Sequence, residues 1–184
     1  MPTIDPYRLV FIDECSVNCA MTRLYGWGHS SERVNEYVKD VRFEKTTLLS
    51  SIRIKKRKQV PFMFKGSLNG EIFSVYIEEF LAPTLKKGDI VILDNLSVHK
   101  IKGALDPIYQ RGATVMFLPP YSPDLSPIEL LWSKMKSGLR RFKASTFDDL
   151  IFAMKLVLNS MTVDNIVNWF KHCGYSYPCQ VELL

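Results

Sequence analysis

Long apolar runs are missing from this 184-residue sequence. No stretch approaches the roughly 20 consecutive apolar residues that a membrane-spanning helix requires. The first residues include Pro2, Asp5 and Pro6 rather than a basic stretch followed by an apolar one, so they do not indicate a secretory signal. We therefore expect a soluble intracellular protein with no membrane partner.

Cysteine is also scarce, with four residues in the whole chain. A chain that can bury a core of this size does not need disulfides, and a reducing compartment would keep the thiols free. A zinc site is an alternative, because Cys15 and Cys19 could meet His172, Cys173 and Cys179. These spacings match no compact zinc template, so we expect free structural thiols.

Extreme charge is absent too. Lys and Arg outnumber Asp and Glu by 24 to 19, and 47% of the residues are hydrophobic. The small basic excess favours a polyanionic partner without requiring one. The length suits one core, and no linker or internal repeat interrupts it, so we predict a single domain over residues 1–184.

The apolar patterning predicts an α/β domain with a helical C-terminus. Residues 17–44 are hard to assign and suggest an irregular insertion. The expected strands cover 7–12, 45–54, 60–68, 90–93 and 113–118. The expected helices cover 71–85, 99–110, 126–142 and 147–171, with a break near 161–164 where Thr162 or Asp164 could cap a new helix.

Two of the apolar runs end in an aspartate, at Asp13 and at Asp94. If the two strands lie side by side and parallel, both carboxylates emerge at the same sheet edge. Two close acids repel each other unless a cation neutralises them, and Mg²⁺ or Mn²⁺ prefers such oxygen ligands. The neighbouring Glu14 should point to the opposite face. For one aspartate alone a turn or cap residue would be the favoured interpretation, but the like placement of both weakens it.

Glu129 has two interpretations. Ser126-x-x-Glu129 has the pattern of a helix capping box, with Pro127 at the first helical position. From the residues alone the cap is favoured. The two roles are compatible if Ser126 caps the helix and Glu129 turns towards a metal.

Several motifs together resemble one family. They are Phe11-Ile12-Asp13-Glu14, Gly26-Trp27, Leu93-Asp94-Asn95 with His99-Lys100, and the block from Leu118 through Pro119-Pro120-Tyr121-Ser122-Pro123 to Glu129, with Leu131-Trp132. This set resembles the catalytic domain of mariner-type transposases and their bacterial insertion-sequence relatives. The resemblance covers residues 9–141. Serine at 126 and cysteine at 15 depart from the usual asparagine and serine.

The resemblance implies a ribonuclease H-like fold, a central mixed sheet flanked by helices. It implies that Asp13, Asp94 and Glu129 bind two Mg²⁺ ions, for which Mn²⁺ would substitute, and catalyse DNA cleavage and strand transfer. It also implies DNA partners, element ends and target, and a homodimer in the active complex. Family members carry N-terminal helix-turn-helix modules, so the chain is expected to be a catalytic fragment or one half of a split transposase.

Basic residues in two places are candidates for DNA contact. One group is a tetrad between the second and third strands, and the other follows Glu129 on the same expected helix. His99 could approach a phosphate or a metal-bound water, although a surface or capping role suits it equally. Solvated charge is the alternative for the tetrad. The candidates are Lys55, Lys56, Arg57, Lys58, His99, Lys134, Lys136, Arg140 and Arg141.

Two other functions remain open. One is an inactive or domesticated module that binds nucleic acid without turnover, and the other is a ribonuclease H-like nuclease without strand transfer. The presence of all three acids argues against the first. The Pro-Pro-Tyr-Ser-Pro block argues against the second.

Overall fold

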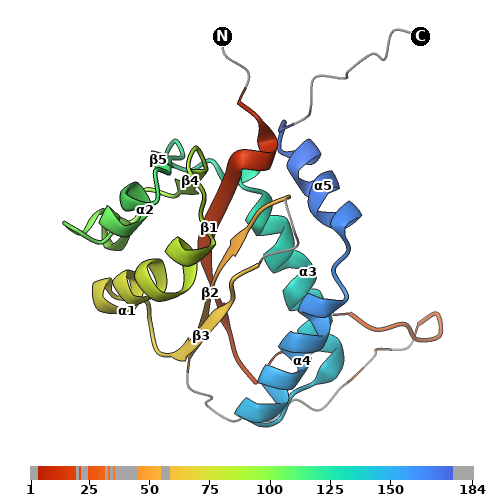
Figure 1. Ribbon diagram of the computed structural model, residues 1–184. Helices are drawn as coiled ribbons and strands as arrows, with labels where there is room; N and C mark the ends of the chain where they lie inside the picture. The colour runs from red at the N-terminus through yellow and green to blue at the C-terminus, as the bar shows by residue number, and fades with distance from the viewer. Residues whose placement is uncertain are drawn as a thin grey trace, which may run out of the picture.

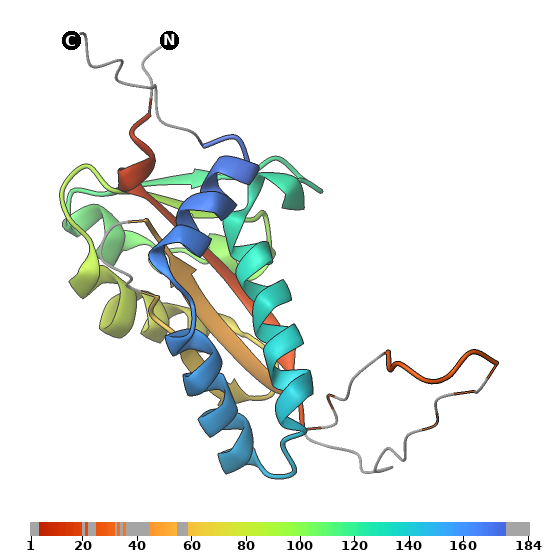
Figure 2. The ribbon, with the colours of Figure 1, turned by 90° about the vertical axis from the view of Figure 1, so that its right-hand side faces the viewer.

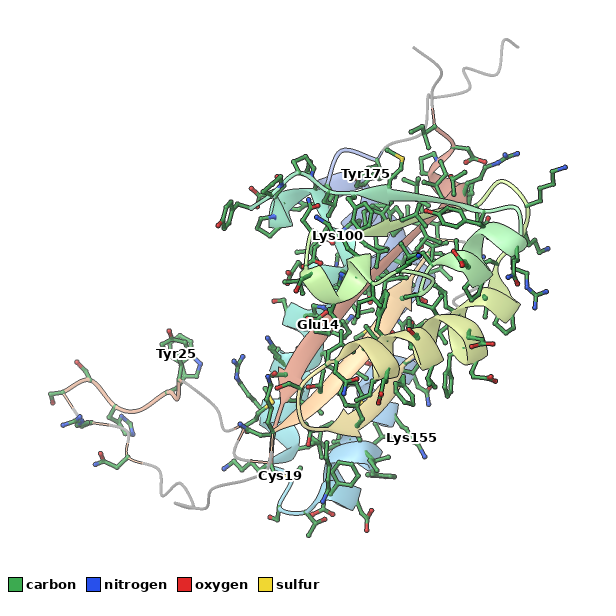
Figure 3. All side chains as sticks on the ribbon, turned by 90° about the vertical axis from the view of Figure 1, so that its left-hand side faces the viewer. Glu14, Cys19, Tyr25, Lys100, Lys155 and Tyr175 are labelled. Atoms are coloured by element: carbon green, nitrogen blue, oxygen red, sulfur yellow. The ribbon has the colours of Figure 1, made fainter. Side chains whose placement is uncertain are left out.

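A computed structural model describes residues 4–19, 21, 25–31, 33, 35, 45–54 and 59–175. The basic tetrad at 55–58 and Cys179 lie outside these ranges. The described residues between Val17 and Thr46 form no helix or strand, as expected for an irregular insertion. Residues 25–31 lie away from the sheet, as the position of Tyr25 shows (Figure 3).

A five-stranded mixed sheet forms the centre of the molecule (Figure 1). Its strands are β1 (Leu9–Val17), β2 (Thr46–Ile52), β3 (Phe62–Lys65), β4 (Ile90–Leu93) and β5 (Thr114–Phe117), arranged in the order β3-β2-β1-β4-β5. The first three strands run antiparallel to one another, whereas β4 pairs in parallel with both β1 and β5. The predicted mixed sheet is confirmed.

Helices cover both faces of this sheet (Figures 1 and 2). One face carries α1 (Gly70–Val75), the π-helical turn η3 (Tyr76–Leu81), η4 (Ala82–Thr84) and α2 (Asp106–Gln110), and the other carries α3 (Pro127–Phe142), α4 (Phe147–Asn159) and α5 (Val163–His172). Side chains of β1 alternate between two buried cores. Val10 and Ile12 join the core under α1, whereas Leu9 and Phe11 join the core under α3.

The structure corrects one predicted strand and one predicted helix. The first strand begins after the short turn η1 (Pro6–Arg8) and continues past Asp13 to Val17, where β2 still pairs with it. No helix spans 99–110, because the chain forms only η5 (Ser97–Lys100) and then α2. Gly103 has a φ of +83°, which stops a helix, and Pro107 fits only the first turn of a new one.

The predicted break in the C-terminal helical region is confirmed, with Thr162 as the cap. Thr162 Oγ1 accepts a hydrogen bond from the Asn165 amide at 3.2 Å, and Asn165 bonds back to the Thr162 amide. This reciprocal pair satisfies backbone groups that would otherwise be unpaired at the start of α5.

Among the described residues no single helix is long and apolar enough to cross a membrane. Helices α4 and α5 together reach that length and composition, but they are bent by 79° relative to each other.

The contact between α3 and α4 depends on Gly138. A methyl group on Gly138 would lie 2.6 Å from Val157 Cγ2. Overpacking of this kind costs about 1–3 kcal/mol, whereas the gain in helix propensity is at most about 1 kcal/mol.

We expect Gly138→Ala to lower the free energy of unfolding by about 1 kcal/mol in urea denaturation, because the steric cost exceeds the helical gain. Ser137→Ala, at an exposed position of the same helix, should stay within about 0.5 kcal/mol of the wild type. Val157→Ala should cost less in the Gly138→Ala background than alone. Strict additivity of the two changes would contradict the proposed contact.

Candidate active site

The parallel pairing of β1 with β4 sets the positions of the two aspartates. The last paired residues are Phe11 and Ile92, and each aspartate lies two residues further along its own strand. Asp13 and Asp94 therefore share a level and face the side of the sheet that α3 covers. Asp94 follows the end of β4 as predicted, but Asp13 lies within β1, at the point where β1 no longer pairs with β4.

Glu129 comes to the same place on the first turn of α3. The expected capping box is not formed, since Ser126 makes no side-chain hydrogen bond to the helix and only its carbonyl accepts the Glu129 amide, at 3.1 Å. The Glu129 carboxylate is therefore not used as a cap. Pro127, at the start of the helix, fixes its first turn.

The three carboxylates line one cavity of about 430 Å³. Its remaining wall is the loop between β5 and α3, which contains the proline-rich motif. The Asn95 side-chain amide donates to the Leu118 carbonyl and so joins the end of β4 to the start of this loop. Within the described ranges, no three acidic, histidine or cysteine side chains converge closely enough to hold one ion together. The arrangement instead provides separate carboxylates around a shared space.

Asp13 is the most perturbed acid of the site. Its pKa is raised to about 7, mainly by burial and to a smaller extent by the charges of Glu14 and Glu129, although a hydrogen bond from Trp132 acts in the opposite direction. The Trp132 indole Nε1 donates to Asp13 Oδ2 at 2.8 Å. Trp132 is buried in the core under α3, and it also orients the carboxylate.

His99 supports the second aspartate from the other side of the sheet. Its ring is fully buried against Phe73, with ring centroids 4.6 Å apart. Its Nδ1 lies 2.7 Å from Asp94 Oδ1 and its Nε2 3.6 Å from Glu14 Oε2. These are close charged contacts without hydrogen-bond alignment. Glu14 lies on the face that carries α1 and α2 (Figure 3).

The two carboxylates determine the charge of His99. Burial disfavours its charged form, but Asp94 and Glu14 outweigh burial and raise its pKa to about 9. For Asp94, burial is likewise outweighed by His99 and by the Leu96 amide, so its pKa is lowered. The prediction that His99 contacts DNA is corrected, because a fully buried ring between two acids cannot reach a phosphate.

The basic residues of α3 lie apart from the carboxylate cavity. Lys134 and Arg141 line a separate groove of about 720 Å³ between α3, α4 and α5, and Lys134 Nζ donates to Asn165 Oδ1 at 2.5 Å. Lys136 lies near the buried thiol of Cys15. Burial raises the pKa of the Cys15 thiol, and the charge of Lys136 offsets part of this rise. DNA contact by Lys134, Lys136, Arg140 and Arg141 stays a prediction.

The described cysteines are free thiols. Cys15 and Cys173 are buried, and Cys19 Sγ donates to the Thr146 carbonyl at 3.2 Å. No zinc cluster forms among the described cysteines and histidines.

The Glu14–His99 contact was not predicted, although the spacing of His99 five residues after Asp94 was the available signal.

The sequence matches the family described as DDE superfamily endonuclease over residues 8–151. This match covers most of the chain, which therefore belongs to that family. The predicted identity as a DDE endonuclease domain is confirmed. A comparison with curated proteins finds no significant match.

Solved structures of one mariner transposase share the fold. The Mos1 transposase paired-end complex with left transposon end matches with a TM-score of 0.71 and 15% identity, over 91% of this chain and 52% of that one. The Mos1 strand transfer complex matches with a TM-score of 0.69 and 17% identity, over 94% and 56%. The catalytic domain of Mos1 mariner transposase matches with a TM-score of 0.63 and 14% identity, over 91% and 76%.

The chain thus spans about half the length of the transposase chains in these DNA complexes. The predicted ribonuclease H-like fold, a mixed sheet between helices, is confirmed by the match. Two further Mos1 paired-end structures are described with Mn and with Mg.

Asp13→Asn should stabilise the metal-free protein at pH 8. The pKa of Asp13 is about 7 in the folded chain against 3.8 when unperturbed, so the folded state holds this proton more tightly. Stability therefore falls as the pH rises from about 4 to 7, by on the order of 2 to 4 kcal/mol. The asparagine carbonyl can still accept from Trp132.

Urea denaturation in EDTA at pH 5 and pH 8 measures this effect. The variant should gain stability over the wild type at pH 8 and little at pH 5. An equal difference at both values would show that the Asp13 charge is not destabilising.

His99→Phe should keep the packing against Phe73 and lose about 1–3 kcal/mol of stability, because the Glu14 and Asp94 carboxylates lose their cation. Solvent screens part of the loss, since the Asp94 side chain is 43% exposed. Adding Glu14→Gln to His99→Phe should recover part of it in urea denaturation. If the double variant were less stable than His99→Phe alone, the charge interaction would be refuted.

Proposed function

We propose that this domain catalyses DNA cleavage and strand transfer in transposition. The observation that carries the proposal is the meeting of Asp13, Asp94 and Glu129 around one cavity, in a member of the DDE endonuclease family. Asp13 is a buried acid whose acidic neighbours are Glu14 and Glu129. Such a cluster of negative charge suits a phosphate substrate that binds together with divalent cations.

The cavity fits divalent metal ions by the chemistry of its donors. Carboxylate oxygens are the ligands that Mg²⁺ and Mn²⁺ prefer. The raised pKa of Asp13 reflects its burial first and the nearby charges of Glu14 and Glu129 second, and a bound cation would offset both. Asp13, Asp94 and Glu129 would hold these ions. When bound, the ions would lower the pKa of the attacking hydroxyl and stabilise the departing oxygen.

The chain's own residues hold these ligands in place. Trp132 fixes one oxygen of Asp13, and His99 holds Asp94 against the end of β4. Glu129 is carried by a helix that begins at the cavity and packs on the sheet. Because three separate elements supply the acids, a phosphodiester can enter between them without displacing any element.

The proposed partners are DNA element ends and target DNA, in a homodimer that pairs two ends. Support comes from the similar Mos1 structures, which are a paired-end complex, a pre-cleavage transpososome and a strand transfer complex. We propose that a separate N-terminal half, corresponding to the helix-turn-helix modules of family members, recognises the element ends. The setting would be a bacterial nucleoid or a eukaryotic nucleus.

Asp94→Asn should abolish this activity while leaving the fold intact. Labelled DNA from the ends of the element that encodes the chain is incubated with Mg²⁺ or Mn²⁺, with the DNA-binding half added where needed. We expect the variant to cleave on the order of 10³-fold more slowly, because a metal ligand is lost. Asp106→Asn, an exposed aspartate on α2, is the matched control and should cleave normally.

The products separate the candidate functions. Joined strands support transposition, whereas cleavage without joining would indicate a nuclease. Binding without cleavage by the wild type would indicate an inactive nucleic-acid-binding module. Equal cleavage by Asp94→Asn and the wild type would refute the carboxylate site.

A further inference from the structure

The helix that carries Glu129 is preceded by the short turn η6 (Pro123–Leu125). None of the three residues of η6 is buried, and the Ser126 side chain makes no capping hydrogen bond. Neither burial of η6 nor a side-chain cap therefore fixes the start of α3. One bond reaches this turn from a distant part of the chain, because the Tyr175 hydroxyl donates to the Leu125 carbonyl at 2.8 Å.

The position of Tyr175 is set by the end of α5. Gly174 has a φ of +86°, and its N–H donates to the Lys171 carbonyl at 3.0 Å. The N–H of Tyr175 donates to the Phe170 carbonyl at 2.9 Å. This pattern is a Schellman motif, in which a glycine takes the left-handed conformation and the next residue packs back on the helix. The Tyr175 and Phe170 rings accordingly have centroids 6.1 Å apart.

The ring of Tyr175 also contacts the strand that carries Asp13. Its centroid lies 5.2 Å from that of Phe11, which comes two residues before Asp13 and points to the same face of β1. Figure 3 shows Tyr175 at the end of the molecule where β1 begins. Tyr175 thus contacts the strand of one acid through its ring and the turn before the helix of another through its hydroxyl.

We propose that Tyr175 is a positioning residue that sets the position of Glu129 relative to Asp13 for divalent metal binding. The proposal rests on the DNA-processing function above and adds a residue that acts through the acids. The Leu125 carbonyl lies four residues before Glu129, so loss of the hydroxyl bond frees the start of α3 to shift relative to β1. Mg²⁺ tolerates little departure from ideal geometry, so a shifted carboxylate binds it less well. Tyr175 lies beyond residues 8–151, which match the family.

Manganese binding to the 184-residue chain tests this role without turnover. Isothermal titration calorimetry at pH 8 gives the Mn²⁺ dissociation constant of each variant. Tyr175→Phe keeps the ring and removes the hydroxyl, so it should fold normally and bind Mn²⁺ about 2- to 10-fold more weakly, the effect of one hydrogen bond. It should also need about 2- to 10-fold more Mg²⁺ for half-maximal DNA cleavage, and saturating Mg²⁺ should restore the wild-type rate.

Tyr76→Phe is the matched control. The Tyr76 hydroxyl donates to the Val60 carbonyl at 2.9 Å, in the core under α1, so this variant loses the same kind of bond on the other face of the sheet. Its thermal unfolding midpoint should fall at least as far as that of Tyr175→Phe, because Tyr76 is fully buried. Its Mn²⁺ binding should equal that of the wild type. Equal weakening by the two variants would indicate a general loosening of the fold and overturn the inference.

The Glu129→Gln background shows whether the Tyr175 hydroxyl acts through the glutamate. Glu129→Gln alone should weaken Mn²⁺ binding. Adding Tyr175→Phe should then change the binding no further, because the ligand that Tyr175 positions is already lost. The inference is wrong if Tyr175→Phe causes the same loss in both backgrounds, or if Glu129→Gln binds Mn²⁺ like the wild type.

The outcomes distinguish this inference from the proposed function. If the wild type cleaves DNA and Tyr175→Phe matches it in Mn²⁺ binding and in Mg²⁺ dependence, the positioning role is refuted and the function stands. If the wild type does not cleave DNA and Asp94→Asn leaves Mn²⁺ binding unchanged, the carboxylate site fails and the inference fails with it.

Discussion

The parallel contact between β1 and β4 brings two acids that are 81 positions apart in the sequence, Asp13 and Asp94, to one level of the sheet. Three residue pairs, ending at Phe11 and Ile92, fix this register. A slip of one residue would send one of the two aspartates to the opposite face of the sheet. The other residues of the site are arranged around the point where the two strands separate. Trp132 contacts Asp13, His99 contacts Asp94, and Glu129 lines the same cavity.

Bringing the acids together is electrostatically unfavourable, and the fold balances this cost differently for each one. Asp94 gains the His99 cation from behind the sheet, which lowers its pKa. Asp13 gains neutral donors, the Trp132 indole N–H and the Glu14 backbone amide, and its pKa stays high at about 7. The uncompensated charge is therefore concentrated on the acid in the centre of the site. A bound cation would therefore relieve most of the electrostatic cost at Asp13.

The sequence allowed the sheet, the helical C-terminus and the positions of the acids to be predicted because these depend on local pattern. Apolar runs of four to six residues predict buried strands, and the break at Thr162 follows from capping chemistry. The helix over 99–110 was wrong because apolar spacing outweighed the Gly103 and Pro107 signals. The end of β1 was misplaced because an acid was taken as a terminus, whereas pairing with β2 continues the strand through it.

Tertiary charge contacts lay beyond sequence reasoning. The Ser126-x-x-Glu129 pattern suggested a cap, and only the fold reveals that the serine leaves its capping role unfilled. An unused cap would be a small loss of stability, about 1 kcal/mol, but it leaves the glutamate carboxylate beside the two aspartates. Stability is also lost at Asp13, which is buried near like charges, and at Tyr121, whose backbone is strained and whose side chain is exposed. Three unfavourable local choices around one cavity are hard to explain by folding alone, and together they indicate that a ligand offsets them.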